Sequence, residues 1–177
     1  MVQYAVPIAD IQKLNWAQSS GDGDGDAFDE LDEGVISGTP DDDATDWFSN
    51  NTGAEDSIRC QVTALVDPWW DHTNHKVYVR VRANSGHIAP TQLSLYQGAV
   101  QIATMQQLVN VTWTTVTLTL SEAEAATITD YTDLRIDVHR YSGTDGDGNQ
   151  LWCSAMEFEC PDGYVFSTAK MAGGFLF

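Results

Sequence analysis

The residues best suited to metal chemistry lie in an acidic segment near the start of the chain. Asp22, Asp24 and Asp26 stand at the first, third and fifth positions of a calcium-loop template, and Glu33 stands at the twelfth. The sixth position is Ala27, where the sharp turn of that loop needs glycine, and the flanks lack the pattern of paired helices. We therefore predict a solvated acidic loop, with an irregular calcium site as the alternative.

A second acidic turn and two histidines could also hold a cation. Asp145 and Asp147 lie in a segment that is typical of a hairpin connection. His72 and His75 have the three-residue spacing of metal ligands on a helix, but Pro68 nearby indicates a loop. Spacing indicates no third ligand. We predict no cofactor, with calcium as the open alternative.

Motifs of known catalytic sites do not occur in the sequence. It contains no GxSxG, HExxH, P-loop or dinucleotide glycine pattern. Glycoside hydrolysis uses two carboxylates that meet in space, and the sequence singles out no such pair. We predict that the protein is not an enzyme.

Trp69 and Trp70 stand together in the polar segment DPWWDHTNH. Exposed aromatic rings supply a large contact area at a low cost in entropy, so this pair can stack on a sugar or contact a partner. In a receptor-binding domain, Tyr78 and Tyr141 would join them. The interpretation that we favour is that one ring tucks into the rim of the fold and anchors the loop.

The net charge of −18 is concentrated before residue 57, where Lys13 is the only base. Such a surface repels nucleic acid, because binding there depends on cations that meet phosphates. No apolar run approaches the roughly 18–20 residues of a membrane span, and the first residues lack the pattern of a secretory signal. We expect a protein made in a cytoplasm that binds neither nucleic acid nor membrane.

Three cysteines, Cys60, Cys153 and Cys160, match no metal motif. Cys153 and Cys160 are separated by an odd offset, so in one regular strand they would face opposite sides and could not bridge. Cys60 could meet either of them across strands. In a reducing compartment, buried free thiols are the expected state.

The elements that must position these residues are predicted to be strands. In KVYVRVRA (76–83) apolar and polar residues alternate with period two, which is typical of a half-buried antiparallel strand. Similar runs follow, with a turn at 97–98 and a capping box of Ser121 and Glu124 before a short helical turn. We predict an all-β fold, an antiparallel two-sheet sandwich of jelly-roll type with one short helical turn. A closed barrel is the alternative.

The chain is predicted to comprise an N-terminal arm and acidic loop (1–27), a β-sandwich domain (28–161) and an apolar C-terminal arm (162–177). The segment 28–35 is either a strand or a turn. Alternate strand positions should share one core between the sheets. These positions are Val77, Val79, Val81, Leu93, Leu95, Val116, Leu118, Leu134, Ile136 and Val138.

Six stretches resemble a module that is widespread in structural proteins of tailed bacteriophages and their prophages. They are TPDDDATDW, SIRCQV, KVYVRVRANSG, LSLYQGAVQIAT, WTTVTLTLSEAEAATITDYTDLRIDV and LWCSAMEFECP, and they cover roughly residues 35–161. LYQG combined with SEAEAATITDYTDLR is the most specific part. The sequence departs from the module in the inserted stretch TDWFSNNTGAED and in the tail after Pro161.

The resemblance implies a jelly-roll-like virion component without catalytic residues to carry over. We therefore expect a non-enzymatic phage virion structural protein, a capsid decoration protein on the particle exterior, made in the host cytoplasm. Its partners would be the major capsid protein, other virion proteins and further copies of itself. The alternative is a tail or fibre receptor-binding module that contacts host-surface carbohydrate.

The apolar end of the chain supplies further expected contacts with partners. Phe175, Leu176 and Phe177 follow the last predicted strand, and an exposed apolar tail is a liability unless a surface covers it. The tail either folds back over its own sandwich or lies as an arm on an adjacent copy or on the capsid. Trp69 and Trp70 are the other predicted partner contacts.

Overall fold

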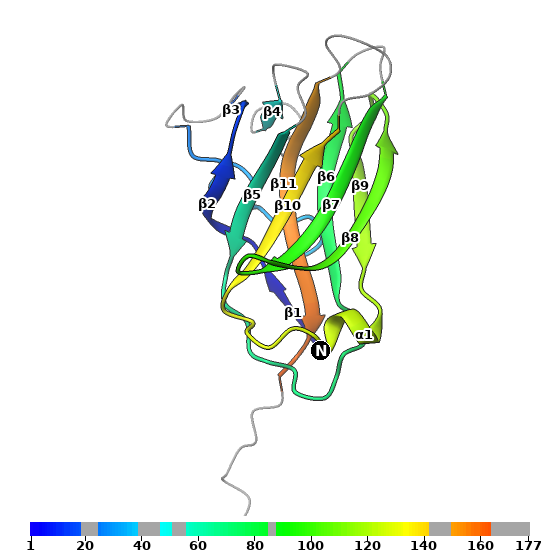
Figure 1. Ribbon diagram of the computed structural model, residues 1–177. Helices are drawn as coiled ribbons and strands as arrows, with labels where there is room; N and C mark the ends of the chain where they lie inside the picture. Colours follow the sequence, from blue (N-terminus) through cyan, green and yellow to red (C-terminus); the bar gives the residue numbers. More distant parts are fainter. Residues whose placement is uncertain (19–24, 39–46, 51–55, 85–87, 142–149, 164–177) are drawn as a thin grey trace, which may run out of the picture.

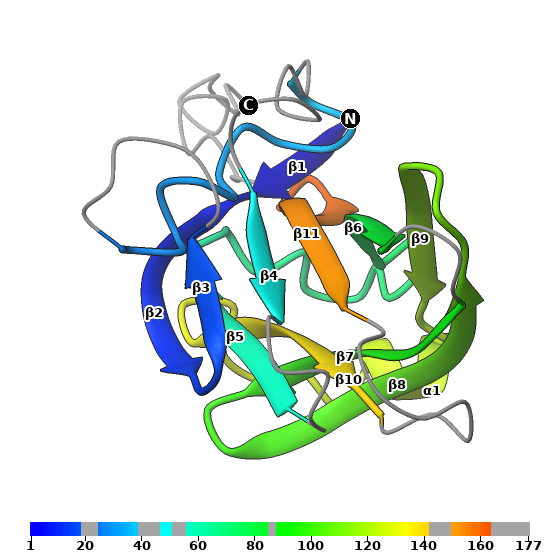
Figure 2. The ribbon, with the colours of Figure 1, turned by 90° about the horizontal axis from the view of Figure 1, so that it is seen from above.

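A computed structural model describes residues 1–18, 25–38, 47–50, 56–84, 88–141 and 150–163. These residues form two antiparallel sheets packed face to face, with one short helix at one end (Figure 1). Figure 2 shows the two sheets as separate layers. The predicted two-sheet β-sandwich of jelly-roll type is confirmed. None of the helices in the described part of the chain could cross a membrane.

The six-stranded sheet has the order β3-β4-β11-β6-β9, and β1 also pairs with β11. The five-stranded sheet has the order β2-β5-β10-β7-β8. The elements in chain order are β1 (Val2–Ala5), β2 (Pro7–Lys13), β3 (Trp16–Gln18), β4 (Phe48–Asn50), β5 (Asp56–Val62), β6 (Lys76–Ala83), β7 (Ala89–Gln97), β8 (Val100–Val109), β9 (Thr114–Thr119), α1 (Glu122–Ala125), β10 (Leu134–Arg140) and β11 (Leu151–Pro161).

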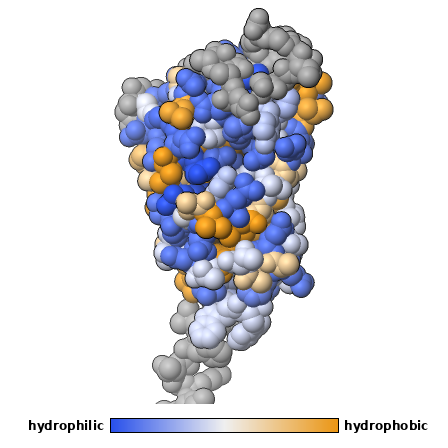
Figure 3. Space-filling model, viewed as in Figure 1, coloured by the Kyte–Doolittle hydropathy of each residue, from blue (hydrophilic) through white to orange (hydrophobic). Residues whose placement is uncertain are grey.

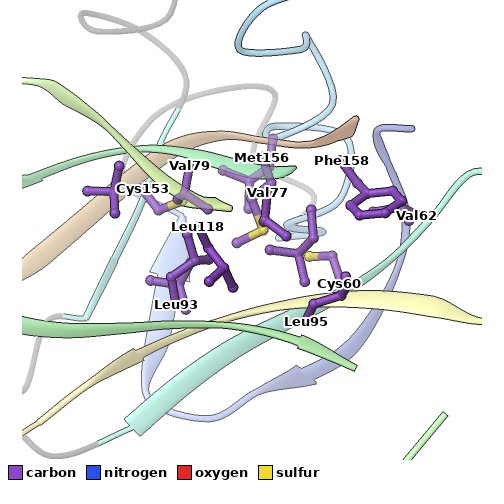
Figure 4. Packing of buried hydrophobic residues seen from close by; sticks show 14 of the residues in the cluster. Cys60, Val62, Val77, Val79, Leu93, Leu95, Leu118, Cys153, Met156 and Phe158 are labelled. Atoms are coloured by element: carbon purple, nitrogen blue, oxygen red, sulfur yellow. The ribbon is translucent and has the colours of Figure 1, made fainter. Parts of the chain in front are cut away.

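The core lies between the two sheets and is built from alternate strand positions. The ten residues predicted to share it all belong to one apolar cluster, and none is more than 5% exposed. Figure 4 shows side chains of both layers meeting, with Leu93 and Leu95 on one side and Val77 and Met156 on the other. This burial fixes the register, because a slip of one residue would turn every core side chain toward solvent.

A bulge in β11 changes which way its cysteines face. The pairing of β11 with β6 shifts between Cys153 and Ala155, and such an extra residue reverses the alternation that follows it. Cys153 and Cys160 therefore both lie in the core. The prediction that they face opposite sides was wrong, because it assumed a regular strand. All three cysteines are free and buried, as predicted, and burial raises the pKa of Cys160 to about 12.

The segment predicted as an N-terminal arm contributes strands to both sheets. β1 pairs with β11, β2 with β5, and β3 with β4. The segment that follows, 28–35, forms turns rather than a strand. The carbonyl of Leu31 accepts a hydrogen bond of 3.0 Å from the Met156 N–H. Leu31 is fully buried, so this segment fills the length of β11 between its pairings with β4 and β1.

The two most specific stretches of the phage resemblance meet at one end of the sandwich. Gly98 lies in the turn between β7 and β8 and has a φ of +57°, which glycine adopts without steric strain. Its N–H donates to the carbonyl of Asp133 at 2.9 Å. The side-chain oxygen of Gln97 accepts from the N–H groups of Thr129 at 2.8 Å and Asp130 at 3.0 Å. LYQG and TITDYTD are therefore tied together, and their roles here are structural.

The short helix begins as the sequence predicts. The Ser121 side chain accepts from the Glu124 N–H, and the Glu124 carboxylate accepts from the Ser121 N–H at 2.7 Å. These reciprocal bonds lower the pKa of Glu124. The predicted capping box is confirmed.

Candidate functional site

Most of the predicted calcium ligands, namely Asp22, Asp24, Asp145 and Asp147, lie outside the described residues. Asp26 is described, and its carboxylate lies 4.0 Å from the ammonium of Lys13. Within the described ranges, no three His, Cys, Asp or Glu side chains gather closely enough to hold a metal ion. The solvated loop at residues 21–26 stays a prediction, with calcium binding as its alternative.

Trp69 and Trp70 lie on the loop between β5 and β6 and are 61% and 64% exposed. The loop is shaped by local hydrogen bonds. The Asp67 carboxylate accepts from the Trp69 N–H at 2.7 Å, and the Asp71 N–H donates to the Pro68 carbonyl at 3.2 Å. Both rings therefore lie on the surface at one end of the sandwich. The other predicted partner contacts, Phe175, Leu176 and Phe177, fall outside the described residues.

The four aromatic residues predicted to contact sugar do not come together. Tyr78 lies on the outer side of the six-stranded sheet, is only 8% exposed and donates its hydroxyl to Glu159 at 2.7 Å. Val35 packs against it. Tyr141 follows β10 in the other sheet. A single site made of this pair with Trp69 and Trp70 is excluded by the topology.

Polar and aromatic side chains gather instead on the outer face of the five-stranded sheet. Ile136 and Val138 face the core, so Asp137 between them points outward. Its register partners are Arg59 on β5 and Ser94 on β7. Figure 3 views this side of the molecule, and hydrophilic colours cover most of it. We call this set the polar face and define it as Arg59, Gln92, Ser94, Tyr96, Asp137, His139 and Tyr141.

The centre of the polar face is an ion pair stacked on an aromatic ring. Arg59 Nε donates to Asp137 Oδ1 at 2.9 Å, and the guanidinium lies 3.8 Å from the centroid of the Tyr96 ring. Burial raises the pKa of Asp137, and the charge of Arg59 opposes that shift. The ion pair and the aromatic ring together hold Arg59 in one orientation.

A second group lies at the other end of the polar face. The rings of His139 and Tyr141 meet edge to face at 4.6 Å between centroids, and the Tyr141 hydroxyl donates to the Gln92 side chain. Gln92 Nε2 in turn donates to Ser94 Oγ at 3.1 Å. Beside Tyr141 is a pocket of about 190 Å³, which is lined by Pro90, Thr91, Gln106, Gln107 and Leu108.

Another aromatic cluster lies on the six-stranded sheet. Trp47 and Trp152 stack with 3.9 Å between ring centroids. The Arg82 guanidinium lies 3.7 Å from the Trp152 ring and 5.1 Å from that of Trp113. The rings and the guanidinium stack face to face on one another. We therefore interpret this cluster as a structural contact that joins β11, β6 and the residue before β9. Sequence reasoning missed this cluster and the polar face, although both occupy the outward positions of predicted strands.

His75 is fully buried beneath the tryptophan loop, and both of its ring nitrogens have partners. Nδ1 lies 3.0 Å from the Thr73 carbonyl, so Nδ1 carries the proton. Nε2 accepts from the Tyr131 hydroxyl at 2.7 Å. Burial lowers the pKa of His75, so the folded state holds the neutral ring at a pH where an unfolded histidine is already charged.

We predict that His75 makes the protein acid-sensitive. Its contribution to stability is complete above the ordinary histidine pKa of about 6.5 and is lost as the pH falls below it. Urea unfolding between pH 7.5 and 5.5 should show a fall in stability that is smaller in His75→Gln. His72→Gln, a change in the same loop, is the comparison and should reduce the pH dependence less than His75→Gln does, because burial is the largest cause of the lowered His75 pKa. Equal slopes for wild type and His75→Gln would contradict the prediction.

No family model matches the chain, and no curated protein matches it in sequence. Solved structures with a similar fold include a CBM4 carbohydrate-binding module, with a TM-score of 0.42 and 12% identity over 78% of this chain and 89% of that one. The family 30 carbohydrate-binding module of a cellulosomal cellulase from Clostridium thermocellum has a TM-score of 0.45 and 13% identity, covering 87% and 96%.

A third similar structure is an arabinose-bound GH51 α-L-arabinofuranosidase, with a TM-score of 0.45 and 14% identity. The match covers 86% of this chain but only 25% of the hydrolase, so it spans a minor part of that enzyme. Identities this low concern the β-sandwich fold. No ligand, substrate or activity is carried over from these proteins.

Proposed function

We propose that this protein is a non-enzymatic binding domain that recognises carbohydrate on its polar face. The observation that carries the proposal is the row Tyr96, Arg59 and Asp137, joined by the 3.8 Å stack and the 2.9 Å ion pair on adjacent strands. These side chains stand on the interior strands β5, β10 and β7 rather than on loops. Groups held in place before binding lose less conformational entropy when a ligand arrives.

The chemistry of the polar face suits a sugar chain. A sugar ring presents C–H groups on its faces and hydroxyl groups around its rim. Tyrosine rings can contact the former, while guanidinium, carboxylate and amide groups can bind the latter. Tyr96 lies opposite Arg135, six positions before Tyr141, so the backbones of the two tyrosines stand roughly 20 Å apart at about 3.3 Å per residue. That length accommodates several sugar units, with the pocket beside Tyr141 at one end.

Binding without hydrolysis is proposed for a specific reason. Glycosidases place two carboxyl groups on opposite sides of the bond that they cleave. Among the seven residues that define the polar face, Asp137 is the single carboxylate, and it is 2% exposed and paired with Arg59. It is therefore suited to fixing Arg59 rather than to protonating a leaving group.

Glycan-array screening followed by calorimetry tests the proposal. We expect Tyr96→Ala and Tyr141→Ala to weaken binding at least about tenfold, which corresponds to about 1.4 kcal/mol. Trp69→Ala, on the loop between β5 and β6 and outside the polar face, is the matched control and should bind as wild type does. Unchanged melting temperatures would show that the variants stay folded. Loss of binding in Trp69→Ala alone would move the site to the tryptophan loop, and no binding to any glycan would refute the proposal.

Attachment to a virus particle is a second proposal, which is supported by the sequence resemblance over residues 35–161. In a tail or fibre, the polar face would meet host-surface carbohydrate. In a capsid, the protein would decorate the exterior. Gel densitometry of purified particles separates the two settings, because a decoration protein is present in many copies and a fibre tip in few.

A further inference from the structure

The five strands at the edges of the two sheets, β1, β2, β3, β8 and β9, are protected to very different degrees. β1 has four residues. β3 has three residues and β9 has six. β2 contains Pro7, Asp10 and Lys13, and its pairing with β5 shifts register twice. β8 is ten residues long, and its sequence VQIATMQQLV contains no charge, no proline and no glycine. Natural proteins usually guard an edge of this length with such residues, because it otherwise pairs with another strand.

The hydrogen bonding of Pro90 on β7 shows which backbone groups of β8 point toward the unpaired edge of the sheet. The Pro90 carbonyl accepts from the Tyr141 N–H at 3.1 Å, so this residue directs its backbone toward β10 rather than β8. Its register partner Leu108 therefore directs its own N–H and C=O to the outer edge. Because successive residues of a strand direct their backbone groups to opposite edges, Gln106 and Thr104 also direct their N–H and C=O to the outer edge. No strand among the described residues pairs with this edge.

We propose that two copies of this chain pair antiparallel through β8, about a two-fold axis at Gln106. Thr104 then lies opposite Leu108 of the second copy, and the two Gln106 residues face each other. Each of these residue pairs can exchange two backbone hydrogen bonds, because all three residues direct their N–H and C=O outward. The two five-stranded sheets become one continuous sheet, with the polar faces of both copies on the same side.

A second copy fits this edge better than an unrelated strand does. A two-fold pairing of β8 with itself is self-complementary, so one surface supplies both halves of the interface. Copies with a net charge of −18 repel each other over most of their surfaces. Two copies can approach each other closely along β8, because this strand carries no charge. Pairing also covers Leu108, which is 63% exposed.

The residue on the axis allows a charge-swap experiment on the full chain. Gln106→Lys and Gln106→Glu each place two like charges directly opposite one another, which disfavours pairing. Sedimentation equilibrium should show a wild-type dimer and a dimerisation constant weakened at least about tenfold, or about 1.4 kcal/mol, in either variant. Mixing the two variants should restore a dimer. Gln101→Lys, on the same strand but away from the axis, is the control and should dimerise as wild type does.

Amide hydrogen exchange by NMR gives a second, residue-specific test. The N–H groups of Thr104, Gln106 and Leu108 should exchange rapidly in dilute protein and become protected as the concentration rises. Those of Met105 and Gln107, which pair with β7, should be protected throughout. A monomer at all concentrations, or a mixture of the charge variants that stays monomeric, would overturn the proposal. Protection in dilute protein that disappears when residues 164–177 are removed would show that the chain's own tail covers β8.

Discussion

Replacing Ile136 with alanine is expected to lower the free energy of unfolding by about 2–5 kcal/mol. Ile136 has no exposed surface, and it lies on β10, the central strand of the five-stranded sheet. It pairs with Cys60 on one side and Leu95 on the other, and both of these residues are fully buried. The cavity left by the lost side chain would be bounded by two hydrogen-bonded neighbours, so the surroundings cannot collapse into it cheaply.

The matched control is Arg135→Ala on the neighbouring, outward-facing position. Arg135 pairs with Asp133 at 2.9 Å near the surface, and an ion pair in such a place is worth about 0–1 kcal/mol. Urea unfolding of wild type and both variants measures the difference. A loss of less than about 1 kcal/mol in Ile136→Ala, or an equal loss in both variants, would mean that the core does not depend on β10 as described.

The core was predictable because it depends on local alternation. Each strand that faces a core on one side repeats its apolar residues with period two, and that pattern is visible in the sequence without knowing any partner strand. The turn at Gly98 and the cap at Ser121 are equally local, since the turn depends on the positive φ of one glycine and the cap on hydrogen bonds between residues three apart. Both were predicted for that reason.

The bulge at Cys153 and the fate of residues 25–38 were not predictable from local patterns. The bulge depends on how β11 meets β6, which lies about seventy residues earlier in the chain. Leu31 enters the core because β4 and β1 leave a length of β11 uncovered. No periodicity in the segment indicates that gap, so the sequence left both a strand and a turn open for residues 28–35.

The polar face was likewise predictable only in part, because the orientation of its side chains is local and the order of its strands is not. The alternation places Arg59, Tyr96 and Asp137 on the outward sides of their strands. Only the strand order β5-β10-β7 brings them together, and that order joins segments that are far apart in sequence. Tyr78 is the converse case, because it also points outward but is covered by Val35 and bonded to Glu159.

Replacing Glu157 with alanine is expected to lower the free energy of unfolding by about 2–5 kcal/mol, because it removes a buried carboxylate that accepts several hydrogen bonds, each worth about 1.5–3 kcal/mol when the acceptor is charged. The Glu157 carboxylate has no exposed surface. It accepts from the Ile36 N–H at 2.5 Å, from the Ser37 N–H at 3.2 Å and from the Ser37 hydroxyl. Gly34, with a φ of +75°, turns the chain so that these donors converge.

The size of this effect follows from what the contact holds in place. Without the carboxylate, the backbone N–H groups of Ile36 and Ser37 lose a charged acceptor, and a hydrogen bond to a charged group is worth about 1.5–3 kcal/mol. The same segment inserts Leu31 into the core and bonds to Met156. Its release would also expose the length of β11 that it covers, so the loss should be shared by the whole domain.

Graded substitutions separate the carboxylate from the packing around it. Glu157→Gln keeps the size but lacks the charge, and we expect a loss of about 1.5–3 kcal/mol. Ser37→Ala removes one hydroxyl donor and should cost about 0.5–1.5 kcal/mol. Limited proteolysis should cut Glu157→Ala within residues 25–38 faster than wild type. If Glu157→Ala matched wild type in urea unfolding and in cleavage, the segment would be held by Leu31 alone, and the buried carboxylate would have no part in closing this side of the sandwich.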